Sequence, residues 1–138
     1  MNGNFQAWAL CLIRLTLGVV FIAHGSQKIF GLFGGPGLTN FVAWAATVGI
    51  PAWLGYLAAL FEFVSGLLLF CGIASELGAV MIMCVMMGAI WFVHGSHGFF
   101  LQNNGFEYVL VLLLMALAVV IGGVGTCALW DLFKARRG

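Results

Sequence analysis

Four long apolar stretches dominate this sequence. They cover about residues 5–30, 52–73, 76–94 and 107–129, and each is close to the roughly 20 residues that a helix needs to cross a hydrocarbon layer about 30 Å thick. Of the 138 residues, 64% are hydrophobic and 7% are charged, which is more apolar surface than one water-soluble core can bury. The sequence therefore predicts an all-α integral membrane protein: a four-helix bundle of two helical hairpins, forming a single domain over residues 1–138.

The first stretch is expected to remain as a span, because it lacks the basic segment and small-residue cleavage site of a signal peptide. Three basic residues near the C-terminus, Lys134, Arg136 and Arg137, favour the cytoplasmic side of the membrane. Four spans then put both termini in the cytoplasm. In this orientation tryptophans mark both interfaces of the membrane, with Trp8 and Trp130 inside and Trp53 and Trp91 outside. The net charge of +1 gives no indication of nucleic-acid binding.

The connection over residues 31–50 is the longest one between the apolar stretches. It opens with GLFGGPG, whose glycines and proline end the first helix. Phe41, Trp44, Ala45 and Val48 then recur at i, i+3, i+4 and i+7, the period of an amphipathic helix. We expect a short interfacial helix in this first outer loop, which acts either as a lid over the end of the bundle or as a filler of space.

Polar residues are predicted to gather at the outer end of the bundle. At 1.5 Å per helical residue, His24 and His94 lie at nearly the same depth, roughly 29 Å and 27 Å from the inner ends of their spans. Lys28 and His97 follow them by about one turn, and Glu107 enters the last span from the same side. Ionisable groups inside a membrane mark functional sites by default, and imidazole beside a carboxylate can transfer protons near neutral pH.

Arg14 and Glu62 are expected to form a second polar layer deeper in the membrane. Counted from the inner ends of their spans, they lie at roughly 14 Å and 15 Å. A lone charge at such depth costs several kcal/mol, about 3 on insertion scales, so pairing the two charges lowers the cost. The sequence predicts a structural ion pair between them, with a role in proton movement as the alternative.

Three ligands suit the outer cluster: a quinone headgroup, which needs a donor to each carbonyl and a proton path, an anion, or a metal ion. The metal is the weakest, because one carboxylate and no thiolate accompany the imidazoles. The four cysteines lie in apolar spans and form no C-x-x-C pair, so thiol–disulfide exchange is not expected. We find no dinucleotide fingerprint and no haem, flavin or iron–sulfur motif, so electrons for a quinone would come from a partner protein.

Several motifs resemble those of the DoxX family of small four-helix bacterial membrane proteins. They are RLTLGVVFIAHGSQKIFG, the acid of FEFVSGLLLFCGI, and HGSHGFF followed by GFEYVLVLLL, and together they extend over nearly the whole chain. The resemblance implies a location in the bacterial inner membrane and a subunit of membrane oxidoreductases, such as thiosulfate:quinone oxidoreductase, or an association with detoxification or oxidative-stress proteins. The family's motif positions correspond in this sequence to Arg14, His24, Lys28, Glu62, His94 and Glu107. His97 is an additional imidazole.

The leading hypothesis is a membrane subunit of a quinone-linked oxidoreductase system. In it, His24 and His94 are hydrogen-bond donors to the quinone, Glu107 sets their protonation, and Lys28 and His97 help to bind the ligand. One alternative is a non-catalytic assembly or anchoring subunit that contacts lipid and either a partner protein or further copies of itself. The other is a small transporter, suggested by a repeat: each half of the chain carries His-Gly-Ser followed by Phe-Glu-aromatic-Val.

Overall fold

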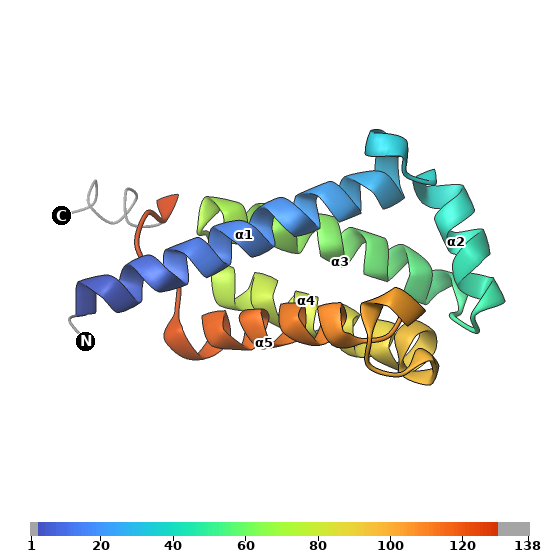
Figure 1. The fold of residues 1–138 in the computed structure, drawn as a ribbon. Coiled ribbons are helices and arrows are strands. Elements are labelled where there is room, and N and C mark those ends of the chain that lie inside the picture. Colours follow the sequence, from blue (N-terminus) through green and yellow to red (C-terminus); the bar gives the residue numbers. More distant parts are fainter. Residues whose placement is uncertain (1–2, 130–138) are drawn as a thin grey trace.

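A computed structural model describes residues 3–129 of the chain. The described residues form helices and no strand. The α-helices, labelled in Figure 1, are α1 (Gly3–Phe30), α2 (Gly37–Thr47), α3 (Ala52–Cys71), α4 (Ser75–Ala89) and α5 (Glu107–Gly122). Short helical turns connect them: η1 (Leu32–Gly34), the π-helical η2 (Ile90–His94), η3 (Gly95–His97) and η4 (Leu101–Asn103).

Within residues 3–129, three helices are long and apolar enough to cross a membrane. They are α1 with 28 residues, α3 with 20, and the helical run Ser75–His97 with 23. The predicted stretches 5–30, 52–73 and 76–94 correspond to these helices. The fourth stretch, 107–129, was expected to be helical throughout, but α5 has 16 residues and ends at Gly122. Gly123 and Gly125 adopt φ angles of 83° and 70°, a backbone conformation that glycine tolerates and a continuing helix does not allow.

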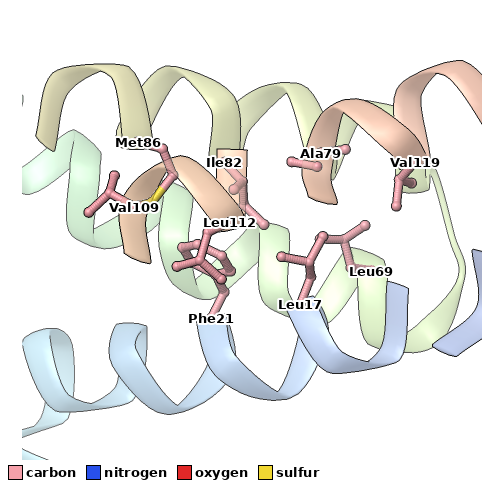
Figure 2. Close-up of a cluster of buried hydrophobic side chains, with 10 residues drawn as sticks. Leu17, Phe21, Leu69, Ala79, Ile82, Met86, Val109, Leu112 and Val119 are labelled. Atoms are coloured by element: carbon pink, nitrogen blue, oxygen red, sulfur yellow. The ribbon is translucent and has the colours of Figure 1, made fainter. Parts of the chain in front are cut away.

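The long helices pack along one another in a closed sequence of contacts: α1 on α3, α3 on α4, α4 on α5, and α5 back on α1. Figure 1 shows them running side by side, with α2 across one end. Figure 2 shows the apolar core between them, to which α1 contributes Leu17 and Phe21, and α4 contributes Ile82 and Met86. Many large apolar side chains point outward instead, among them Leu12, Val19, Leu60, Val111 and Ile121. An apolar exterior of this kind is what a lipid environment requires.

Helices α1 and α3 approach closely at glycines. A Cβ atom added to Gly25 would lie 2.6 Å from the Cα of Phe63, and one added to Gly66 would lie 2.5 Å from the backbone nitrogen of Ile22. These contacts bring residues late in α1 against the middle of α3, so the two helices run antiparallel with a fixed register. Small residues allow such backbone approach in membrane helices, where dispersion contacts and not water exclusion drive association.

The helix predicted in the first loop is confirmed as α2. Its buried residues Phe41 and Val42 pack with Ala59 of α3, and Trp44 remains 46% exposed. Pro36 immediately precedes the helix, as expected for a residue that ends the preceding segment. The prediction that α2 lies at the membrane interface remains a prediction. The basic residues Lys134, Arg136 and Arg137, and also Trp130, lie outside the described residues, so the predicted orientation also remains a prediction.

The close contact at Gly66 gives a test of this packing. We expect Gly66→Ala to destabilise the protein in detergent by about 1–3 kcal/mol, the usual cost of overpacking, because the new methyl group meets backbone that cannot move away alone. Gly88→Ala is the matched control, since a Cβ atom there has nothing within 4 Å. Thermal unfolding followed by circular dichroism measures both. Equal unfolding temperatures for the two variants would contradict the close contact.

Candidate functional site

Lys28 and Glu62 form an ion pair between α1 and α3. Nζ of Lys28 donates to Oε1 of Glu62. The Glu62 residue is 2% exposed, whereas the Lys28 side chain is 24% exposed. The same Nζ atom lies 4.8 Å from the centroid of the Phe41 ring, within the range of a cation–π interaction. Lys28 therefore connects three helices, α1, α2 and α3, at one end of the molecule.

The predicted ion pair between Arg14 and Glu62 is wrong. Arg14 bonds instead to the carbonyl oxygens of Leu69 and Phe70, which lie seven and eight residues beyond Glu62 on α3, about 10–12 Å further along the helix. The prediction measured the depth of Arg14 from Phe5 as the inner end of its span. Helix α1 has 28 residues and α3 has 20, so α1 extends past α3 and residues at equal counts from the two ends are not level.

Arg14 is fully buried, with 0% exposure, and apart from a contact of Nη2 with Sγ of Cys11 at 4.0 Å its donors go to backbone carbonyls. Besides the two carbonyls of α3, the guanidinium donates from Nε to Val124 at 2.9 Å and from Nη2 to Thr126 and Cys127, each at 3.2 Å. The last carbonyls of a helix have no partner within the helix, and they carry the negative end of its dipole. Arg14 thus joins α1, the end of α3 and the segment after α5 without a carboxylate.

His94 is the last residue of η2, and its ring is fixed by the loop that follows. Nδ1 lies 2.8 Å from the backbone oxygen of Asn104. Because a carbonyl oxygen only accepts, Nδ1 must carry the hydrogen, which leaves Nε2 of the neutral ring as an acceptor. His97 makes a similar bond from Nδ1 to the backbone oxygen of Val93, at 2.8 Å.

Glu107 is the first residue of α5 and shapes the same loop. Its Oε1 accepts from the backbone nitrogen of Leu101 at 2.7 Å, and its own nitrogen donates to the oxygen of Phe99 at 2.9 Å. Glu107 was expected to set the protonation of the histidines. In the structure the Asn104 carbonyl determines which nitrogen of His94 carries the hydrogen, and the carboxylate of Glu107 holds the loop backbone.

A cavity of about 300 Å³ lies between α2, α3, α4 and η2. Among the residues predicted for the site, Lys28 and His94 line it, and so does Glu62, which was expected elsewhere. His24, His97 and Glu107 are not among its lining residues, and His24 is exposed on α1. The remaining wall is mostly apolar and includes four aromatic rings, those of Phe41, Trp44, Phe61 and Phe92. No group of three or more metal-binding side chains occurs within residues 3–129.

Sequence reasoning missed the aromatic wall and the place of Glu62. A signal is present in the spacing, because the lining residues Cys84, Gly88 and Phe92 recur every four positions, as do Leu54, Ala58 and Glu62. Each set forms one stripe on a helix. The stripes become recognisable as the walls of a cavity only when the facing helix is known.

The outward-facing apolar side chains, the internal ion pair and the cavity at one end define a small helical membrane protein with a ligand-sized pocket. This chain belongs to the DoxX family, whose sequence model matches residues 9–95. It is similar to a Bacillus subtilis (strain 168) protein named "Putative oxidoreductase CatD", at 30% identity over 86% of this chain and 83% of that protein. It is also 29% identical to an uncharacterized protein of Haemophilus influenzae, over 94% of both chains. No solved structure matches it.

The reassigned ion pair can be tested with two double-mutant cycles. Lys28→Met and Glu62→Gln should show a coupling energy of about 1–3 kcal/mol, because the residues are in direct contact. Arg14→Lys and Glu62→Gln should add to within about 0.5 kcal/mol, as expected for separated sites with no shared partner. Unfolding in detergent gives all the required free energies. A coupling between Arg14 and Glu62 as large as that between Lys28 and Glu62 would contradict the structure.

Proposed function

We propose that this protein is a membrane subunit of a quinone-linked oxidoreductase system and that the cavity between α2, α3 and α4 holds the ring of its ligand. The observation that carries the proposal is the composition of the cavity, which combines aromatic walls with Lys28, Glu62 and His94. Binding sites for small molecules are concave and mostly apolar, with a few polar groups that orient the ligand. This cavity has that composition.

The size of the cavity also suits a quinone headgroup. A cavity of about 150 Å³ in another protein holds benzene, so one of about 300 Å³ accommodates a substituted six-membered ring. Phe41, Trp44 and Phe92 provide faces and edges against which the ring packs. The ammonium group of Lys28 is the donor for a quinone carbonyl, and the cavity remains close to neutral because Glu62 balances that charge.

Two further observations support a redox role. The family is DoxX, and the relative from Bacillus subtilis is named "Putative oxidoreductase CatD". We found no dinucleotide, haem or iron–sulfur motif in the sequence, so the proposal includes a partner protein that supplies electrons. It also includes the bacterial inner membrane as the location, α5 as a fourth span of the bundle, and both termini in the cytoplasm.

The second candidate function is a non-catalytic anchoring or assembly subunit. The loop between η3 and α5 favours it, because Phe99, Phe100 and Leu101 are 48%, 58% and 53% exposed. The Asn104 carbonyl of the same loop bonds to His94 of the cavity lining. Exposed apolar groups of this kind contact either lipid or another protein. Purification from the native membrane followed by mass spectrometry separates the two functions. A stoichiometric quinone supports the redox subunit, and a constant protein partner without any cofactor supports the anchor.

Blocking the cavity provides a direct test. A Cβ atom at Gly88 has nothing within 4 Å and Gly88 lines the cavity, so Gly88→Phe should place a ring inside it without disturbing the core. We expect this variant to bind a short-chain ubiquinone analogue at least about tenfold more weakly than the parent, a loss of about 1.4 kcal/mol. Isothermal titration calorimetry in detergent measures the affinity.

The control for this test is Leu60→Phe. Leu60 is 52% exposed on α3 and is not among the residues that line the cavity, so the added ring should leave the affinity within about twofold of the parent. Both variants must elute as monodisperse species. If Gly88→Phe binds the analogue as tightly as the parent, the ligand does not occupy this cavity.

A further inference from the structure

Glu62 carries a carboxylate oxygen that its ion pair does not use. Oε1 accepts from Lys28, whereas Oε2 is buried and has no hydrogen-bond partner among the residues that the structure describes. Leaving a polar group buried and unpaired destabilises the protein, and more so for a charged group. Because Glu62 lines the cavity, a ligand there can supply the missing donor.

His94 adds a second acceptor to the same cavity. Its Nδ1 hydrogen is taken by the Asn104 carbonyl, so Nε2 of the neutral ring has a lone pair to offer. The donor in the cavity, the Lys28 ammonium, is already bonded to Glu62. An ammonium group has three N–H bonds, so Lys28 can still donate to a ligand, but the two free acceptors, Oε2 of Glu62 and Nε2 of His94, are satisfied only by a ligand that also donates.

The charges in the cavity define the ligand further. Lys28 and Glu62 carry opposite charges in direct contact, so their fields largely cancel. An anion would have to compete with Glu62 for Lys28, and a cation would be repelled by Lys28. A neutral ligand that donates a hydrogen bond meets neither obstacle. The rings of Phe41, Trp44 and Phe61 in the wall favour an aromatic ligand.

We propose that the cavity selects neutral phenolic rings, such as a hydroquinone, over rings that lack a hydroxyl donor, including the corresponding quinone. One hydroxyl donates to Oε2 of Glu62, and His94 is the acceptor for a second. The terminal torsion of a glutamate side chain is broad, so a small rotation turns Oε2 toward the cavity. This inference rests on the proposed binding function and specifies its ligand as the reduced form of the ring.

The test compares 4-propylphenol with 4-propylanisole, which differ by a methyl group that removes the hydroxyl donor. A hydrogen bond to a charged group contributes about 1.5–3 kcal/mol, so the parent protein should bind the phenol at least about tenfold more tightly than the anisole. Calorimetry in detergent measures both affinities. Neither compound requires a redox partner, and the Glu62→Gln variant separates the hydrogen bond from the effect of the extra methyl group.

Glu62→Gln should abolish this preference. The Lys28 ammonium can only donate, so it takes the amide oxygen and leaves the amide NH₂ in the place of Oε2. The cavity then offers an N–H donor. The oxygens of the phenol and of the anisole can both accept from it, so the ratio of the phenol and anisole affinities should fall to about one. Tyr56→Phe is the control. It removes a polar oxygen from the same helix but outside the cavity lining, and should keep the ratio of the parent.

The outcomes separate the two proposals. If the parent protein binds the phenol and the anisole equally, or binds a quinone more tightly than its hydroquinone, the selection for a donor is wrong and the binding function stands. If the Glu62→Gln variant keeps the full preference, Glu62 is not the acceptor and the inference is likewise overturned. If neither these compounds nor the ubiquinone analogue binds, the proposed function itself fails.

Discussion

A guanidinium cannot lose its charge in a protein, so the burial of Arg14 requires acceptors for its donors. The carbonyl oxygens of five residues meet this need, two at the end of α3 and three in the segment after α5. Phe70 is the next-to-last residue of α3, so its carbonyl has no partner within the helix and accepts from Arg14 instead. These bonds connect α1 to the end of α3 and to the segment that follows α5. Glu62 is therefore not needed to neutralise Arg14, and its carboxylate pairs with Lys28 instead.

The pairing of Glu62 with Lys28 determines the character of the cavity. Removing two charges from water is costly, and their attraction repays that cost only with good geometry and further hydrogen bonds. Here Lys28 gains contact with the Phe41 ring, whereas the second oxygen of Glu62 gains no partner within the described part of the chain. The pair therefore stabilises the junction of α1, α2 and α3 but leaves one group incompletely satisfied, next to a cavity with aromatic walls.

The sequence predicted those features that depend on local pattern. The apolar stretches identified α1, α3 and α4, and the spacing of Phe41, Trp44 and Ala45 identified α2. The sequence could not predict the pairing of charges, because the pairing depends on how far one helix extends past its neighbour. Counting residues from the end of each span does not give that offset. Lys28 and His94 were expected at one site and both line the cavity, but Glu107 holds a loop instead. Glu107 belongs to the Phe-Glu-aromatic-Val motif at the start of α5, whereas the matching motif with Glu62 lies in the middle of α3.

The π-helical turn η2 sets the direction of His94 relative to α4. In it the backbone nitrogen of Gly95 donates to the oxygen of Ile90, five residues earlier, so the helix contains one residue more than a regular turn. Each helical residue rotates the chain by about 100°, and the extra one changes the direction of everything that follows. The buried core residues Ala79, Ile82 and Met86 all precede the turn. Deletion of a single residue from η2 would therefore turn His94 to another face of the helix while Ala79, Ile82 and Met86, which come before it, kept their packing.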